Sequence, residues 1–149
     1  MIVETANIND AEEILSLQKL AYKSEAKLYN DFPIPPLVEN LDELKDKFKS
    51  HVFLKATVEG KIIGSVRILQ KDNTCYVGRL MVLPDFQNRG VATKLLLEIE
   101  RKFSCGRLEL FTGDKSLKNI RLYKKLGYKK FKIEKPVGNV VLVFLEKTR

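Results

Sequence analysis

The pattern of apolar and polar positions divides the chain into helical and extended segments. Apolar residues recur at helical spacing in four places, which predict helices over 10–28, 40–48, 90–103 and from Asp114 or Ser116 to Leu126. Alternating or continuous apolar runs bounded by turn residues predict strands over 2–6, 51–59, 61–70, 74–83, 107–111, 128–133 and 140–146. The segment 30–36, which holds three of the five prolines, is predicted to be an ordered loop.

Polar residues mark where these helices begin and end. Asn9 and Asp10 are candidate caps of the first helix, because acidic residues follow them three positions later. Asn40 and Glu43 have the same spacing at the start of the second helix. Gly127 follows the last helix, at a position where a C-terminal cap needs a positive φ.

The order of the segments predicts the fold class. Three consecutive strands between 51 and 83 are joined by tight turns, which favours an antiparallel meander. The third strand is apolar on both faces apart from Arg79, which is typical of a strand in the middle of a covered sheet. The helix at 90–103 then leads to the strand at 107–111 by a crossover. We expect a single α/β (α+β) domain over 1–149, a mostly antiparallel sheet of about seven strands flanked by about four helices.

Composition excludes several classes of protein. The 149 residues are 44% hydrophobic and 31% charged, as in ordinary globular proteins. One histidine and two distant cysteines, Cys75 and Cys105, match no zinc or disulfide pattern, so we expect no metal and a reducing, cytoplasmic location. No stretch approaches the roughly 20 apolar residues of a membrane span.

The net charge of +8 is unevenly distributed. Residues 115–149 hold 11 basic and two acidic side chains, which points to an anionic partner such as nucleic acid or a phosphate-rich small molecule. Residues 1–46 hold ten acidic side chains against four lysines. The chain is therefore acidic at one end and basic at the other.

The segment 82–93 is the best candidate for chemistry. A buried strand stops at Pro84, passes through a polar loop and opens a helix at Gly90. The first turn of a helix offers unpaired N–H groups and the positive end of the helix dipole, which together bind anions. Gly90 leaves room for a phosphate, Ala92 keeps the next position small, and Arg89 adds a positive charge. The chain has no Walker loop and no dinucleotide-binding glycine motif.

Two motifs in this region resemble those of the GNAT superfamily of acetyl-CoA-dependent N-acetyltransferases. The first is the Q/R-x-x-G-x-G/A signature, met by Gln87, Gly90 and Ala92. The second, an N-x-x-x-x-Y-x-x-x-G-[FY] helix and turn, is met from Asn119 to Tyr128. The motifs span about 74–130, and the elements before them follow the order usual in that family.

The resemblance implies a function and roles for individual residues. The protein is expected to move an acetyl group from acetyl-CoA directly to a primary amine in a ternary complex, with the Val82 N–H polarising the thioester and Tyr123 protonating the departing thiolate. Lys115, Lys118 and Arg121 are placed to attract the phosphates of CoA. The residues expected to bind the cofactor are Met81, Val82, Gln87, Asn88, Arg89, Gly90, Val91, Ala92, Thr93, Asn119 and Tyr123.

The acceptor side is less specific in the sequence. The end of the first helix, the loop after it and the central strand offer Glu25, Tyr29, Asp31 and Arg79 as residues that would bind a small-molecule or peptide amine. The acidic N-terminal part favours a cationic amine. A non-catalytic acyl-CoA-binding module and a basic nucleic-acid-binding protein are the alternatives, although the basic residues match no nucleic-acid-binding motif. The sequence is compatible with a monomer or a homodimer and leaves the choice of acyl group open.

Overall fold

A computed structural model describes residues 1–30, 33–136 and 138–149. The strands are β1 (Ile2–Thr5), β2 (Val52–Val58), β3 (Lys61–Lys71), β4 (Thr74–Val82), β5 (Arg107–Gly113), β6 (Lys129–Glu134) and β7 (Leu142–Thr148). The helices are α1 (Ala11–Leu28), α2 (Pro35–Val38), α3 (Leu41–Lys47), α4 (Val91–Lys102) and α5 (Leu117–Lys125), with short 3-10 turns η1 (Ile8–Asp10) and η2 (Pro84–Phe86). None of the helices in these ranges has the length and apolarity needed to cross a membrane.

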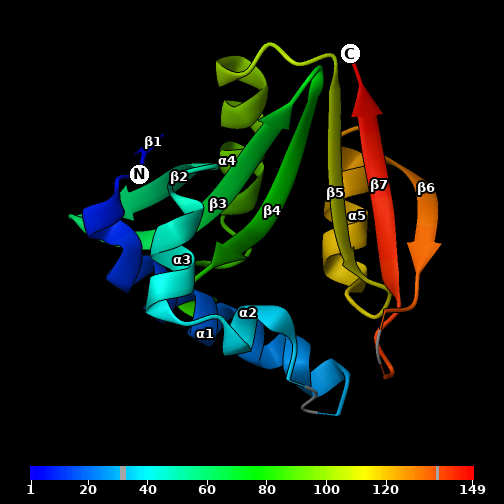
Figure 1. The fold of residues 1–149 in the computed structure, drawn as a ribbon, viewed down its shortest axis with the longest axis horizontal. Coiled ribbons are helices and arrows are strands. Elements are labelled where there is room, and N and C mark those ends of the chain that lie inside the picture. The colour runs from blue at the N-terminus through cyan, green and yellow to red at the C-terminus, as the bar shows by residue number, and fades with distance from the viewer. Residues whose placement is uncertain (31–32, 137) are drawn as a thin grey trace.

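The strands form one mixed sheet in the order β1-β2-β3-β4-β5-β7-β6 (Figure 1). The pair β4–β5 is parallel, as the predicted crossover through α4 requires, and the other pairs within the described ranges are antiparallel. β4 is the fourth of the seven strands, which confirms its predicted place in the middle of the sheet. The predicted fold class is therefore confirmed.

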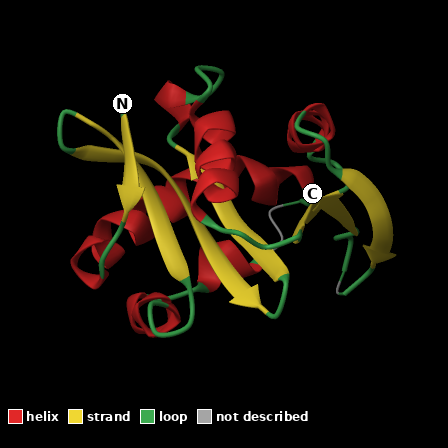
Figure 2. Ribbon diagram, turned by 90° about the horizontal axis from the view of Figure 1, so that it is seen from above, coloured by secondary structure: helices red, strands yellow, loops and turns green. Residues whose placement is uncertain are grey.

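Helices cover both faces of the sheet (Figure 2). On β3, an added Cβ at Gly64 would meet Val91 and Leu95 of α4, whereas Arg67 bonds to Gln18 of α1. Because positions three apart on a strand point to opposite faces, α4 and α1 lie on opposite sides of β3. The apolar faces of both helices pack on the central strands, and the core includes Ile14, Leu17, Leu95, Leu96 and Ile99.

Local capping differs from the prediction at the first and last helices. Asn7 forms a capping box with Asp10 at η1, one turn earlier than expected, while Asp10 makes no side-chain cap on α1. Ser116 precedes α5 but its side chain does not cap the helix, and its hydroxyl donates to Glu25. The Asn40–Glu43 capping box and the positive φ of Gly127, +99°, are confirmed.

The helix α2 was predicted to be loop. Proline at the first helical position has its φ already fixed near the helical value and has no N–H to leave unpaired. Ile34 stays extended as the N-cap, and the helix ends after one turn at Glu39. The turn is too short to show a helical periodicity in the sequence.

We expect Gly64→Ala to destabilise the fold at the contact between β3 and α4. The new Cβ would lie 2.8 Å from Cγ1 of Val91 and 3.2 Å from the carbonyl oxygen of Met81. Overpacking of this kind costs about 1–3 kcal/mol of the free energy of unfolding, which urea titration measures. Gly78→Ala on β4 is the control, because its Cβ would meet only Cγ of Arg67, at 4.0 Å, and stability there should not fall. Equal losses in the two variants would contradict the prediction.

Candidate functional site

The parallel strands β4 and β5 pair over three residues and then separate. The pairs run from Thr74 with Arg107 to Tyr76 with Glu109. β4 continues to Val82 and β5 to Gly113, and the two strands diverge into a V whose open end lies above α1 (Figure 1). One backbone edge of the second half of β4 therefore has no strand beside it in the described part of the chain.

A bulge in β4 accompanies this separation. The register with β3 shifts between Ser65 and Arg67, so that two residues of β4, Arg79 and Leu80, stand opposite Val66. Arg79 has a φ of +50°, in the left-handed region that costs a non-glycine residue about 1 kcal/mol or more. Bulges bend a strand and redirect its side chains, so this one turns β4 away from β5.

The backbone of β4 alternates between its two edges. The Leu83 N–H donates to the Ile63 carbonyl at 2.8 Å, toward β3, and Met81 is paired with Ser65 on the same side. The N–H and C=O groups of Leu80 and Val82 therefore point into the V. The Leu80 carbonyl accepts from the Tyr22 hydroxyl at 3.2 Å. The Val82 N–H is thus a donor directed into the opening.

The helix α4 begins at this opening with an uncapped N-terminus. Gly90 is the N-cap at a φ of +79°, and no side chain caps the helix. An added Cβ on Gly90 would have no heavy atom within 4 Å, so the space in front of the first turn is open. The N–H groups of Val91, Ala92 and Thr93 precede the first intrahelical donor, Lys94, and face the anion-binding end of a 12-residue helix.

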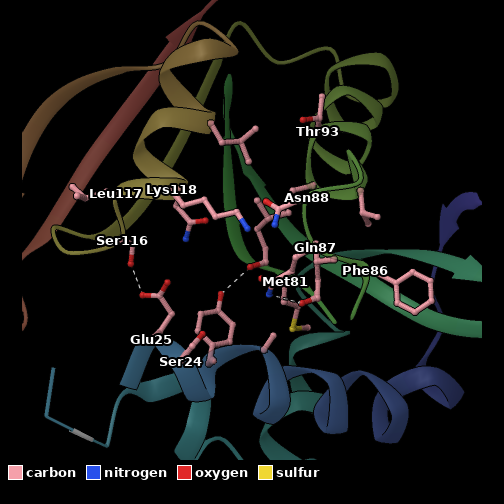
Figure 3. Close-up of a pocket in the computed structure, with 18 of the residues that line it drawn as sticks. Ser24, Glu25, Met81, Phe86, Gln87, Asn88, Thr93, Ser116, Leu117 and Lys118 are labelled. Atoms are coloured by element: carbon pink, nitrogen blue, oxygen red, sulfur yellow. Dashed lines mark hydrogen bonds between the residues drawn. The ribbon is translucent and has the colours of Figure 1, made fainter. Parts of the chain in front are cut away.

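A cavity of about 460 Å³ joins this N-terminus to the open edge of β4 (Figure 3). Gln87 closes it on one side, because its amide donates to the Val82 carbonyl at 3.2 Å and holds the loop against the strand. α1 contributes Ser24 and Glu25, and α5 contributes Leu117 and Lys118. The predicted cofactor-binding residues that line the cavity are Met81, Val82, Gln87, Asn88, Gly90, Val91, Ala92, Thr93 and Asn119.

Two of the expected cofactor-binding residues lie outside this cavity. The Arg89 guanidinium is exposed and lies 5.4 Å from the centre of the Phe86 ring. Tyr123 lines a neighbouring cavity instead. Of the three basic residues expected to attract phosphates, Lys115 and Lys118 line the first cavity and Arg121 does not.

A second cavity, of about 680 Å³, adjoins the first, and Tyr22, Glu25, Leu80 and Asn119 line both. Tyr123 of α5 lies at this second cavity, and its side chain is 4% exposed. Burial raises the pKa of Tyr123 well above its ordinary value, so the phenol stays protonated. Burial also raises the pKa of Tyr22 to about 12. The Tyr22 hydroxyl therefore stays protonated and donates its hydrogen bond to the Leu80 carbonyl.

The predicted acceptor residues have different positions. Glu25 accepts a hydrogen bond from Ser116 and borders both cavities. Tyr29 is buried and joins α1 to the loop after β5, since its hydroxyl donates to Asp114 at 3.2 Å and accepts from the Lys115 N–H at 3.1 Å. Arg79 lines the second cavity. Asp31 lies outside the described residues.

Sequence reasoning missed a buried polar cluster beside Arg79. It consists of Gln18, Glu39 and Arg67, which are each less than a tenth exposed. Arg67 donates to both oxygens of Glu39, at 2.6 and 3.3 Å, and Gln18 donates to one of them at 2.9 Å. Burial acts to raise the pKa of Glu39, but the hydrogen bonds from Arg67 and Gln18 outweigh it and lower that pKa. A charged arginine within the mostly apolar stretch 62–69 is the signal that the sequence offers.

The local charge differs from the expectation drawn from the acidic N-terminal segment. Of the acidic residues in the described part of that segment, Glu25 alone lines the second cavity, which also receives Lys47, Arg67 and Arg79. The others act elsewhere, for example Asp10, which pairs with Lys55 on β2. The net charge of residues 1–46 therefore does not predict the charge of the second cavity, because most side chains of α1 and α3 face away from that cavity.

Comparison with known sequences identifies relatives of this chain. Residues 12–128 match the sequence profile of the acetyltransferase (GNAT) family. An acetyltransferase from Pectobacterium atrosepticum is 34% identical over 80 residues, which are 52% of this chain and 57% of that protein. One from Yersinia enterocolitica is 33% identical over 89 residues, 58% of this chain and 63% of that protein. The chain thus spans less than two thirds of each relative.

Solved structures share the fold at low sequence identity. A PaiA N-acetyltransferase from Thermoplasma acidophilum, solved in complex with coenzyme A, has a TM-score of 0.76 and 20% identity, with 100% of both chains covered. The ribosomal-protein-S18-alanine N-acetyltransferase of Escherichia coli has a TM-score of 0.81 and 16% identity, with 99% of this chain and 92% of that one covered. With the profile matching most of the chain and both motifs on the opening between β4 and β5, this protein belongs to the GNAT family of acetyltransferases.

Proposed function

We propose that the protein transfers an acetyl group from acetyl-CoA to a primary amine by direct attack within a ternary complex. The observation that carries this proposal is the opening between β4 and β5. It connects the uncapped N-terminus of α4 to the Val82 N–H and then to Tyr123 through two adjoining cavities. This arrangement supports a site in which phosphates would bind at the start of α4 and the reaction would take place where the two cavities adjoin.

The residues at the first cavity fit the donor. The N–H groups of Val91, Ala92 and Thr93 suit a pyrophosphate, and the open space at Gly90 admits one. Lys118 and Lys115 add positive charge at the rim. The pantetheine arm would lie along the unpaired edge of β4, in the way a strand partner would. The Thermoplasma protein with this fold is described in complex with coenzyme A, and a Salmonella typhimurium acetyltransferase with a TM-score of 0.75 with acetyl-CoA.

The residues at the junction of the cavities fit acyl transfer. Bound acetyl-CoA would supply a thioester as the acyl donor. The Val82 N–H would donate to the carbonyl oxygen as negative charge develops there. Tyr123 would give its proton to the departing thiolate, and Glu25, which borders both cavities, would accept the proton lost by the amine.

The proposal is tested by two measurements. Acetyl-CoA should raise the melting temperature, because a ligand that binds the folded state stabilises it. A panel of amino acids, polyamines, aminoglycosides and peptides should then show amine-dependent release of CoA. Absence of a thermal shift would refute donor binding. A shift without transfer to any amine would favour the non-catalytic acyl-CoA-binding alternative.

Gly90→Ala should weaken acetyl-CoA binding about tenfold, equivalent to roughly 1.4 kcal/mol. Alanine disfavours the φ of +79°, so the loop would shift and redirect the N–H groups at the start of α4. Isothermal titration calorimetry measures the change in Kd. Gly60→Ala is a matched control, because Gly60 has the same φ of +79° and the same empty surroundings, in the β2–β3 turn. Both variants should lose similar stability, and an equal loss of affinity in both would contradict the role of Gly90.

A further inference from the structure

The second cavity contains more positive than negative charge at its buried end. Arg67 and Arg79 both line it, while Glu39 is the carboxylate that contacts them. Arg67 makes a close ion pair with Glu39 at 2.6 Å, whereas the Arg79 Nε lies 3.9 Å from the same oxygen, beyond hydrogen-bonding distance. Two guanidinium groups therefore share one carboxylate. Charges with little access to solvent are normally paired, and the Arg79 side chain is 23% exposed, so among the described residues the cluster is one negative charge short.

Unpartnered donors agree with this shortfall. The Nε atoms of Arg67 and Arg79 are buried and make no hydrogen bond within the described ranges. The Arg67 side chain is 6% exposed, so solvent does not compensate for the missing acceptor. Burial, and after it the charge of Arg67, lowers the pKa of Arg79. Leaving such donors unpaired is costly unless a ligand satisfies them.

Within residues 1–30, 33–136 and 138–149, the other charged groups at the cavity do not supply the missing negative charge. Lys47 of α3 adds a further cation, and the His51 imidazole follows it on the same side. Glu25 lies at the junction with the first cavity and accepts from Ser116. Tyr22 lies near enough to feel the charges of Glu25, Arg67 and Arg79, but no ion pair joins Glu25 to either arginine among the described residues.

The backbone holds Arg79 in this position at a cost. Its φ of +50° lies in the left-handed region, within the bulge of β4. Arg79 stands three residues before Val82, so the two residues are at most roughly 10 Å apart along the strand, and the bulge shortens this span. An arginine there can reach one end of a small molecule whose other end lies at the reaction centre. The lining of the second cavity is largely apolar and includes Ile34, Pro36 and Tyr76.

We propose that the acceptor amine carries a carboxylate, which pairs with the partly exposed guanidinium of Arg79 beside the Arg67–Glu39 ion pair. This inference rests on the proposed function for the position of the amine. A carboxylate fits because the shortfall is one negative charge and because the guanidinium fork of Arg79, which Glu39 does not occupy, matches two carboxylate oxygens. The apolar walls favour a hydrophobic body between the two groups. The expected substrates are therefore α-amino acids with an apolar side chain, or ω-amino acids with an apolar chain between the amine and the carboxylate, rather than polyamines.

The test compares each acid with its neutral amide. The pairs are phenylalanine with phenylalaninamide and 6-aminohexanoate with 6-aminohexanamide, which separate α-amino from ω-amino acids. We expect kcat/KM to be at least about tenfold higher for the acid of one pair, the ratio that a lost charge-assisted contact produces. Equal values, or a preference for the amides in both pairs, would overturn the inference.

The variant Arg79→Gln tests whether Arg79 causes the preference for the acid over its amide. The variant removes one of two repelling cations and keeps a polar side chain, so it should fold, as circular dichroism and the melting temperature will show. The ratio of acid to amide should fall toward one through a higher KM for the acid, and Arg79→Lys should restore part of it. A ratio unchanged in Arg79→Gln would overturn the role of Arg79.

A binding measurement separates this inference from the proposed function. N-acetylphenylalanine and its amide, and the corresponding pair from 6-aminohexanoate, are titrated into the CoA-saturated protein. Tighter binding of an acid than of its amide, lost in Arg79→Gln, supports the carboxylate site even if no amine is acetylated. Equal binding in both pairs overturns the site even if acetyl transfer is observed.

Discussion

Tyr123→Phe should lower kcat by about 100-fold, the lower end of the range for loss of a general acid. The substitution removes the hydroxyl that would protonate the departing thiolate and leaves the ring, which packs in the core, in place. No hydrogen bond of this hydroxyl is found among the described residues, so its loss should hardly change stability. Release of CoA, followed with a thiol reagent at saturating acetyl-CoA and acceptor, measures the effect.

The matched control is Tyr128→Phe. Tyr128 is also buried, and its ring centre lies 6.1 Å from that of Tyr123, but it lines neither cavity. We expect this variant to keep kcat within about twofold, because it removes a hydroxyl outside the site. Similar losses in the two variants would show that the effect comes from packing and would remove Tyr123 from the mechanism.

The pH dependence gives a second readout for Tyr123. Because burial raises its pKa, the phenol keeps its proton above its ordinary pKa of about 10. The rate should therefore rise as the amine loses its proton and should show no alkaline fall below about pH 10. A fall centred well below that value would mean that another acid, or a less buried Tyr123, donates the proton.

The sequence is sufficient for most of the fold, because the signals concerned are local. Four helices and seven strands follow from periodicity and from turn residues, and Gly127 has the positive φ that its place after a helix requires. The Gln87–Ala92 signature lies at the start of α4, where a helix N-terminus was expected. Gly90 and Ala92 are therefore interpretable from spacing alone.

The rest depends on contacts between distant segments. The separation of β4 from β5 begins after Tyr76 and is accompanied by a bulge at Arg79, and no local pattern marks the residue after which the pairing stops. The ion pair of Arg67 with Glu39 joins positions 28 residues apart in the sequence, from β3 and the end of α2. Likewise, the charge of the acceptor cavity depends on which side chains face it, which a sum over residues 1–46 does not reveal.

The second large effect is expected for Glu39→Gln, which should lower the free energy of unfolding by about 3 kcal/mol. The glutamine side chain would fill the same space and still accept hydrogen bonds, but it would leave Arg67 and Arg79 without a compensating charge in a site where the Arg67 side chain is 6% exposed. Urea unfolding near neutral pH measures the change. Glu98→Gln is the control, since Glu98 pairs with the exposed Arg101 on α4 and its loss should hardly change stability.

The pH dependence of this loss follows from the lowered pKa of Glu39. A carboxyl whose folded pKa lies below its unfolded value of about 4.3 contributes stability above that pH and loses it as the pH falls through the folded pKa. The difference in the free energy of unfolding between wild type and Glu39→Gln should therefore be full near neutral pH and shrink in acid.

Glu39→Gln also has one more uncompensated cation. It should therefore bind N-acetylphenylalanine, or the N-acetylated form of 6-aminohexanoate, more tightly than the wild type does. A stability loss no greater than that of Glu98→Gln would mean that solvent, not Glu39, compensates the two arginines, and would remove the charge shortfall on which the carboxylate site depends.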